Sequence, residues 1–430
     1  MADTEAVRKE RGVDMILGCI ADDFTGATDL ANNLVRAGMR AVQTIGVPAA
    51  DEAIDADAVV VALKSRTAPV DDAVRASLAA ARWLRTHGAR QIYFKVCSTF
   101  DSTAQGNIGP VAEALGAALD AGLAIVTPAF PENGRTVFKG HLFVGELLLS
   151  DSPMRDHPLT PMTDANLVRV LQAQCRSAQV GLVDHRVVAR GAAAVRERIE
   201  ALRREGKTFA IADAVSDDDL RTLALATRDA VLVVAGSGLA IGIPALHGMA
   251  PRDEASQLAP PQGACAIVSG SCSAATNAQV AAFIAAGGAA FAIDALRIAA
   301  GEDQAAQALA WARSRLGASP VLVYATAAPA TVRDVQSRLG AQRAGALVED
   351  TLARVAEGLV AAGVGQLLVA GGETSGACVQ RLGITQLRIG PQIDPGVPWC
   401  HAAAQRLHLA LKSGNFGGHD FFQRAFTLLR

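Results

Sequence analysis

The sequence predicts an α/β protein with two domains, each built on a mostly parallel sheet flanked by helices. Short apolar runs alternate with longer amphipathic segments along most of the chain, as they do in βαβ units. At 430 residues the chain is too long for one typical hydrophobic core. A charged stretch that contains prolines, residues 247–263, interrupts the alternation. We therefore expect one domain over residues 14–246, a linker over 247–263 and a second domain over 264–430.

Hydrophobic periodicity gives the expected elements in order. Apolar residues recur at helical spacing in segment 69–87, and another amphipathic helix is expected at 27–37. In the first domain, apolar runs of strand length lie at residues 15–20, 58–63, 91–97, 123–128, 208–212 and 230–235. After the linker, helices are expected near 274–287 and 347–362, and strands at 264–268, 289–294, 320–325 and 366–370. We find no internal repeat.

Composition and charge exclude several classes of protein. Half of the residues are hydrophobic and 19% are charged, which favours a packed globular protein over a disordered one. The formal net charge is −2 and no basic stripe stands out, so a nucleic-acid partner is not expected. There is no apolar run long enough to span a membrane and no signal peptide. Seven cysteines without a CxxC pair indicate reduced thiols. We expect a soluble cytoplasmic protein.

Polar side chains follow four predicted strands of the first domain. Ligands of open parallel sheets bind beyond the carboxyl ends of the strands, so these loops are expected to converge on one crevice. Arginine suits a carboxylate and acidic side chains suit sugar hydroxyls, which together favour a small polyhydroxylated acid. The candidate residues are Asp22, Asp23, Arg66, Lys95, Ser98, Asp101, Ser102, Asn107, Asn133 and Arg135.

A competing interpretation of each loop is a plain connection from strand to helix. Asp, Ser and Thr are favoured helix N-caps. By this interpretation Asp23 or Thr25 simply caps the helix expected at 27–37.

The second domain has three glycine-containing turns. In residues 268–280, Ser269 and Ser271 lie in a small-residue loop that leads into a helix, a favourable place for a phosphate. The turn at 371–376 follows the same design: glycines allow close approach of a ligand, and Glu373 could hold a divalent cation through water. The last turn covers residues 412–418. No Walker motif is present, but three such turns together predict nucleotide binding.

Two other sites are not supported. Residues 233–244 contain a Gly-x-Gly pair after a strand, but no long helix follows at once and Pro244 interrupts, so a dinucleotide site is not expected there. The eight histidines are dispersed without zinc-ligand spacing. The ligands of any metal ion stay unknown at this stage.

Seven motifs together resemble the four-carbon acid sugar kinase family, and the resemblance covers about residues 14–425. The motifs are ADDFTGATD (21–29), KSRT (64–67), KVCSTFDST with GN (95–107), PAFPENGRTV with GH (128–141), SGSCS (269–273), GGETSG (371–376) and LKSGNFG (411–417).

This resemblance implies an N-terminal domain that binds a four-carbon sugar acid and a C-terminal domain that binds ATP. The γ-phosphate would pass to the C4 hydroxyl in a cleft between the domains, with Mg²⁺ bridging the phosphates. The family's ATP contacts fall on Ser269, with Ser271 near, and on Gly371, Gly372, Glu373, Thr374 and Gly414. We infer that Asp22 and Asp23 face the acceptor, with Asp23 as the base, and that Lys95 steadies the phosphoryl group or the substrate.

The longer stretches, residues 95–103 and 128–146, are most similar to the branch of the family that phosphorylates 3-oxo-tetronate, and residues 151–168 add to this. Threonate and erythronate kinases share the shorter motifs, so both stay open as alternatives. A non-catalytic sugar-acid binding protein and an NAD-dependent hydroxy-acid dehydrogenase are the alternatives from other classes. A homodimer is compatible with the sequence, although no stretch demands one.

Overall fold

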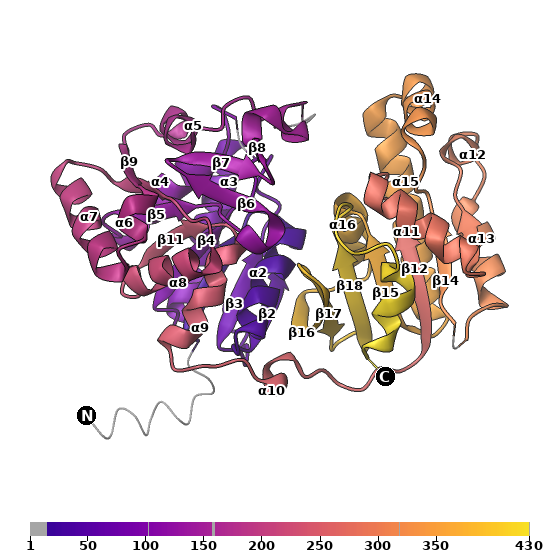
Figure 1. Ribbon diagram of the computed structural model, residues 1–430. Coiled ribbons are helices and arrows are strands. Elements are labelled where there is room, and N and C mark those ends of the chain that lie inside the picture. The colour runs from indigo at the N-terminus through magenta and orange to yellow at the C-terminus, as the bar shows by residue number, and fades with distance from the viewer. Residues whose placement is uncertain (1–14, 102, 157–159, 318, 430) are drawn as a thin grey trace. The chain divides into compact units, whose positions relative to one another are not determined.

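The computed structural model describes residues 15–101, 103–156, 160–317 and 319–429. The chain divides into two compact units, one up to Ser256 and one from Gln257 onward. Each unit is a mostly parallel sheet flanked by helices, which confirms the predicted α/β class (Figure 1).

The sheet of unit 1 is wholly parallel in its paired strands. Its strand order is β2-β3-β1-β4-β11-β5-β10-β9. The strands are β1 (Leu17–Ala21), β2 (Ala41–Ile45), β3 (Ala58–Ala62), β4 (Gln91–Lys95), β5 (Ala124–Thr127), β9 (Val180–Val183), β10 (Phe209–Ala212) and β11 (Leu232–Ala235). The sequence prediction missed β2 and β9 and found the other six.

Helices cover both faces of this sheet. One row contains α3 (Val70–Thr86), α4 (Ile108–Leu119) and α5 (Leu167–Gln174), which contact one another in order. The opposite face carries α2 (Phe24–Arg36), α6 (His185–Val188), α7 (Ala192–Arg204) and α8 (Asp217–Ala226). Right-handed crossovers require this division, because the chain moves along the sheet in one direction through α3 to α5 and in the other through α2 and α6 to α8. Two short helices, α9 (Ile243–Leu246) and α10 (Asp253–Ser256), end the unit.

A small antiparallel sheet interrupts the alternation after β5. It contains β6 (Arg135–Phe138), β7 (His141–Val144) and β8 (Leu147–Leu148), and a single 3₁₀ turn, Pro131–Asn133, precedes it. From the sequence, residues 130–135 of this region were expected to form a polar loop. Asn133 and Arg135, which were expected in one of four converging polar loops, lie in the 3₁₀ turn and at the start of β6, respectively.

The sheet of unit 2 combines a parallel part with an antiparallel edge. Its strand order is β13-β14-β12-β15-β18-β17-β16, and only the pairs β18–β17 and β17–β16 are antiparallel. The strands are β12 (Ala264–Ser269), β13 (Ala289–Ala292), β14 (Val321–Tyr324), β15 (Val364–Ala370), β16 (Gln386–Asp394), β17 (Val397–Ala402) and β18 (Leu407–Lys412). The last three strands were missed.

Helices also cover both faces of the second sheet. On one face α11 (Ala274–Ala285) packs with α17 (Phe421–Arg424). The other face carries α12 (Ala295–Ala299), α13 (Gln304–Arg313), α14 (Pro329–Leu339), α15 (Ala341–Ala361) and α16 (Gly372–Arg381). The core under α11 and α17 includes Trp399, whose ring is fully buried and whose Nε1 donates to the Ala425 carbonyl at 2.9 Å.

Within the part of the chain that the structure describes, no helix is long and apolar enough to cross a membrane.

Candidate active site

Three adjacent strands of unit 1 bring their polar loops together. The carboxyl ends of β3, β1 and β4 lie side by side in the sheet. Arg66, in the loop after β3, donates from Nε and Nη2 to the two carboxylate oxygens of Asp22, each over 2.9 Å. The same Nη2 donates to Asp23 Oδ1 over 2.7 Å. One guanidinium group therefore holds both adjacent carboxylates, and this pairing offsets the repulsion between them.

Lys95, the last residue of β4, completes this cluster. Its ammonium group lies 3.3 Å from Asp23 Oδ1 and 3.9 Å from Asp22 Oδ1, and the side chain is buried. Gly26 makes room for it, because a Cβ on that residue would lie 1.8 Å from Lys95 Nζ. The glycine in the first turn of α2 is thus a requirement of the cluster.

The charges of the cluster keep Asp23 ionised. Burial disfavours its charge, but Arg66 and Lys95 outweigh burial and hold the pKa of Asp23 well below its usual range. In turn Asp23 and Asp22 raise the pKa of Lys95 against the opposing effect of burial, so the ammonium stays protonated. A carboxylate in this state is ionised and can accept a hydrogen bond from a substrate hydroxyl.

Asp23 is also the N-cap of α2, and Thr25 is not. The Asp23 side chain accepts from the backbone N–H of Gly26 at 3.2 Å, and the helix begins at Phe24 instead of residue 27. The capping interpretation therefore holds for Asp23 alongside its ion pairs. The two roles are compatible, since the cap fixes the carboxylate in one orientation.

The loop after β4 holds Asp101 through two neighbours. Thr99 Oγ1 donates to Asp101 Oδ1 at 2.5 Å, and Cys97 Sγ donates to Asp101 Oδ2 at 3.1 Å. Between them the buried Phe100 has a φ of +53°, a left-handed conformation that is costly for a bulky side chain. Burial raises the pKa of the Cys97 thiol to about 11, so it remains a donor. These roles of Cys97 and Thr99 were not predicted from the sequence.

Asn107 fixes the loop that carries Arg66. Its Nδ2 donates to the carbonyls of Ser65 at 2.7 Å, Arg66 at 3.3 Å and Ala68 at 2.9 Å. A small cavity lies beside the cluster, lined by Asp22, Ser65, Arg66, Phe94, Asp101, Asn107, Ile108 and Val111. The predicted residue Asn107 thus orders the loop with its amide nitrogen.

The structure does not bring every predicted acceptor residue into this cluster. Asn133 and Arg135 follow β5, and β11 lies between β5 and β4 in the sheet. Their loop is tied to α2 instead, where Arg36 makes two hydrogen bonds to Glu132, at 2.9 and 3.1 Å. Ser98 lies in the loop after β4, and Ser102 lies outside the described residues.

In unit 2, the three predicted glycine loops meet at the ends of adjacent strands β12, β15 and β18. A Cβ on Gly371, whose φ is +129°, would lie 3.1 Å from the backbone nitrogen of Ser271. A Cβ on Gly414 would lie 2.4 Å from Ser271 Oγ, and one on Gly270 would lie 2.2 Å from Thr374 Oγ1. The loops are therefore so closely packed that a Cβ at these positions would press on a neighbouring hydroxyl or backbone group, and together they form one small-residue surface.

The remaining predicted nucleotide residues differ in exposure. Ser269, at the end of β12, is fully buried and its hydroxyl lies 2.7 Å from Thr326 Oγ1. Gly372 and Glu373 form the first turn of α16, and Thr374 is buried there. Among the described residues, no group of three acidic, histidine or cysteine side chains is arranged to hold a metal ion.

A polar network lies behind these loops and was not predicted from the sequence. Lys412, Thr276 and Gln279 bind the loop of residues 413–418 from the interior. A signal was available, because α11 contains no charged residue yet carries Thr276 and Gln279 three positions apart.

The Gly-x-Gly pair after β11 is a packing feature. A Cβ on Gly236 would lie 2.8 Å from the carbonyl oxygen of Pro128, and one on Gly238 would lie 2.5 Å from that of Ala129. A 3₁₀ segment, Ser237–Gly242, follows in place of a long helix. These glycines allow close approach of two backbones and give no support to dinucleotide binding.

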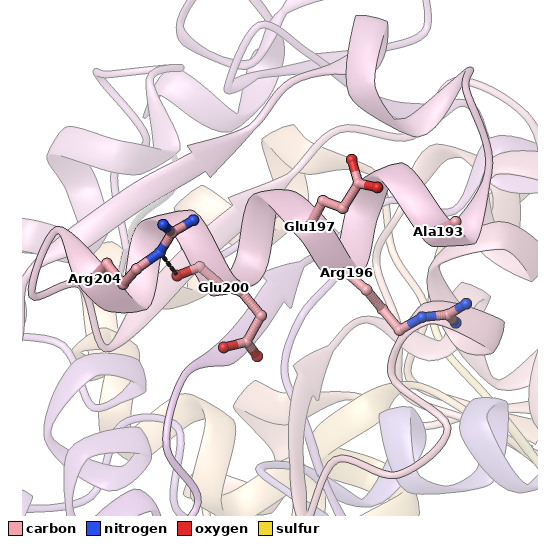
Figure 2. Close-up of a pocket in the computed structure, with 5 residues that line it drawn as sticks. All are labelled: Ala193, Arg196, Glu197, Glu200 and Arg204. Atoms are coloured by element: carbon pink, nitrogen blue, oxygen red, sulfur yellow. Dashed lines mark hydrogen bonds between the residues drawn. The ribbon is translucent and has the colours of Figure 1, made fainter.

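A surface hollow on α7 lacks the features of a site. Figure 2 shows that all the residues lining it, Ala193, Arg196, Glu197, Glu200 and Arg204, come from this one helix. Arg204 Nε donates to the carbonyl oxygen of Glu200 at 3.3 Å. Polar groups from a second element do not join them in the lining.

Comparison with known protein families defines the class of each unit. Residues 17–243 match a sugar-binding N-terminal domain, and residues 266–422 match a nucleotide-binding C-terminal domain. The carboxylate cluster lies in the first of these domains and the three glycine loops lie in the second.

Curated relatives then define the family. A 3-oxo-tetronate kinase of Burkholderia multivorans is 58% identical over 96% of this chain and 97% of its own, and one of Pseudomonas savastanoi pv. phaseolicola is 56% identical with the same coverage. A crystal structure from Salmonella typhimurium LT2 has a TM-score of 0.87 and 43% identity, covering 96% of this chain and 98% of its own. One from Haemophilus influenzae has a TM-score of 0.81 and 43% identity, covering 96% of this chain and 100% of its own. The chain belongs to the 3-oxo-tetronate kinase family, which confirms the resemblance to four-carbon acid sugar kinases.

Proposed function

We propose that this protein transfers the γ-phosphoryl group of ATP to the C4 hydroxyl of 3-oxo-tetronate. The observation that carries the proposal is the pair of carboxylates, Asp22 and Asp23, held by Arg66 and Lys95 in the sugar-binding unit. The substrate follows from the curated relatives, which are 3-oxo-tetronate kinases at high identity over nearly the whole chain.

In this proposal Asp23 orients the attacking hydroxyl. Phosphoryl transfer depends on positioning and charge neutralisation more than on a strong base. Because its pKa lies well below the usual range, Asp23 accepts a hydrogen bond from the C4 hydroxyl and takes the proton only as the new oxygen–phosphorus bond forms. The bond between the γ-phosphorus and the ADP oxygen breaks in the same transfer.

The other acceptor residues hold the rest of the acid. Both cations of the cluster are already paired with carboxylates, so the substrate carboxylate needs a further cation. Arg135, at the start of β6, is the predicted cation that lies outside the cluster, so in this proposal the acid extends from Asp23 at its C4 end toward Arg135 at its carboxylate end. Ser98, Asp101 and Asn133 are the remaining candidates for hydroxyl contacts.

The glycine loops of unit 2 are proposed to bind ATP with Mg²⁺. Close-packed glycines expose backbone N–H groups to phosphate oxygens. Mg²⁺ keeps several waters and binds through phosphates and one or two carboxylates, and Glu373 at the start of α16 fits that role through water. Since ATP is the donor, we place the reaction in the cytoplasm. A homodimer remains a prediction.

The test is ADP release with ATP, Mg²⁺ and a panel of 3-oxo-tetronates, threonates and erythronates of both hands. We expect turnover on a 3-oxo acid, with phosphate on C4 by phosphorus NMR, and a loss of roughly 100-fold or more in kcat for Asp23→Asn. Turnover mainly on threonate or erythronate would contradict the substrate, and no ADP with any acid would contradict the kinase.

A further inference from the structure

Lys412, the last residue of β18, is buried away from any acidic side chain. It is fully buried, and among the described residues no carboxylate lies within salt-bridge distance of it. Its ammonium group donates instead to Thr276 Oγ1 at 3.0 Å and to the carbonyl oxygens of Ser413 at 3.0 Å, Gly414 at 3.1 Å and Phe416 at 3.1 Å. A buried ammonium surrounded by carbonyl dipoles, without an ion pair, is rare in proteins.

The loop of residues 413–418 is held from the same side by α11. Gln279 Nε2 donates to the carbonyls of Phe416 at 3.0 Å, Gly417 at 2.9 Å and Gly418 at 3.0 Å. Thr276 Oγ1 donates to the Gly414 carbonyl at 2.7 Å. Nearly every carbonyl of the loop therefore points toward Lys412 and α11.

Peptide geometry then determines where the N–H groups of the loop point. In a trans peptide the C=O of one residue and the N–H of the next point in opposite directions. The peptides whose carbonyls face inward therefore direct the N–H groups of Gly414, Asn415 and Gly417 away from Lys412. None of these three donates to another described residue, whereas the N–H of Gly418 donates to Asp394 at 2.8 Å. A Cβ on Gly414 would lie 2.4 Å from Ser271 Oγ, so this end of the loop borders the serine loop.

We propose that Lys412 is a positioning residue of the nucleotide site, whose ammonium group holds the loop of residues 413–418 so that its outward N–H groups bind a phosphate of the nucleotide. This inference rests on the proposed function, and it assigns a role to a residue that does not itself touch the ligand. Loss of the proton leaves three carbonyls and a hydroxyl facing an amine with fewer donors and a lone pair. The loop should then loosen and phosphate binding should weaken.

The surroundings of Lys412 bring the loss of its proton, and with it the loosening of the loop, close to neutral pH. Burial lowers the pKa of Lys412 to about 8, and no neighbouring charge contributes to that shift. The titratable and charged groups on the surrounding elements are Glu373, Cys378 and Arg381 on α16, Arg388 and Asp394 on β16, Arg424 on α17, His401 and Cys400 on β17, and His408 on β18. Lys95 in unit 1 is the contrasting case, because carboxylates raise its pKa.

The test is calorimetric binding of MgADP to the full chain without acceptor, from about pH 7 to about pH 9.5. Apparent affinity falls with the fraction of protein in the competent state, so the wild-type Kd should rise about tenfold by about pH 9. Lys412→Arg keeps a charge that does not titrate in this range, and its Kd should stay level. Lys412→Met should bind weakly at every pH. The KM for the four-carbon acid should not follow this profile.

A matched control is Gln279→Ala, which removes the amide nitrogen that donates to three carbonyls of the same loop but leaves the lysine. It should weaken MgADP binding while keeping the pH profile. If Lys412→Arg does not fold, the wild-type profile still decides the question. A wild-type Kd that changes less than about twofold over this range, or no binding of MgADP at all, would overturn the proposal. Binding with the expected profile but no turnover on any four-carbon acid would refute the proposed function and leave this inference intact.

Discussion

The substitution Gly26→Ala tests whether the carboxylate cluster depends on the space that this glycine leaves. The new Cβ would lie 1.8 Å from Lys95 Nζ and 2.3 Å from Asp23 Oδ1. Both contacts are far inside van der Waals distance, and the buried lysine must move. Its ion pair with Asp23, 3.3 Å in the wild type, is then broken or displaced.

Two opposing contributions set the change in the free energy of unfolding of Gly26→Ala. Breaking a buried ion pair costs about 3 kcal/mol, although Arg66 still neutralises Asp23 and reduces this. Alanine in place of glycine inside a helix stabilises the helix by about 1 kcal/mol. The free energy of unfolding should therefore fall by about 2 kcal/mol or less, and Tm by roughly 4–8 °C or less for a unit of this size.

The effect on activity should be larger than the effect on stability. A catalytic group that is displaced by about 1 Å can lower the rate by roughly 100-fold. We expect kcat/KM for 3-oxo-tetronate, measured as ADP release, to fall by about that factor while the protein remains folded at assay temperature.

Gly116→Ala is the matched control. Gly116 also lies within a helix of unit 1, α4, and a Cβ there would meet nothing within 4 Å. This variant should gain about 0.4–1 kcal/mol of stability and keep full activity. Full activity in Gly26→Ala would show that Lys95 can move without consequence and would refute the reasoning.

Three further predictions concern a loop, a histidine and the nucleotide. Asn107→Asp removes a donor to three carbonyls, including that of Arg66. The free energy of unfolding, measured by urea denaturation, should fall by about 1–3 kcal/mol, and activity should fall with it. Unchanged stability would contradict a structural role for the amide. Burial lowers the pKa of His408, whose Nδ1 has no hydrogen-bond partner in the described parts of the chain, so the stability that it contributes is present above its ordinary pKa of about 6.5 and is lost as the pH falls below it. Between about pH 7.5 and about pH 5.5, the free energy of unfolding of the wild type should therefore fall by more than that of His408→Gln. An equal fall in the two proteins would refute this. MgADP at about 100 times its Kd should stabilise the protein by about 2.7 kcal/mol in a thermal melt, whereas AMP without Mg²⁺ should do less; no shift with MgADP would argue against the nucleotide site.

The sequence supplied the fold class and the composition of both candidate sites. Polar residues directly after strands, such as Asp22 and Lys95, could be placed because parallel strands end at a common edge. In the structure β3 and β4, joined through α3, both lie next to β1, so the loops that follow these three strands share one end of the sheet.

The position of Arg135 could not be inferred, because it depends on which strands are neighbours. The chain leaves β4 for β5, yet β11, formed more than a hundred residues later, inserts between them. Sheet order is a long-range property that local hydrophobic patterns do not contain. The small antiparallel sheet that begins at Arg135 was hidden for a related reason, as its strands are only two to four residues long.

The role of Lys412 was equally hidden. A lysine beside a glycine turn normally predicts a solvent-exposed side chain. Burial of this side chain depends on α11, which lies more than a hundred residues earlier and supplies Thr276 and Gln279. The strand of Lys412 was itself missed, because the antiparallel edge of the sheet breaks the alternation of strands and helices.

The thiol of Cys97, which donates to Asp101, is protected from oxidants because it stays protonated. A cysteine reacts with peroxide or alkylating agents as the thiolate, and a pKa of about 11 leaves roughly one Cys97 in ten thousand ionised at neutral pH. The carboxylate that accepts its hydrogen bond also repels the negative charge that oxidation chemistry requires. The acceptor loop thus contains a sulfur atom that serves as a hydrogen-bond donor and that reacts slowly with reagents that attack thiolates.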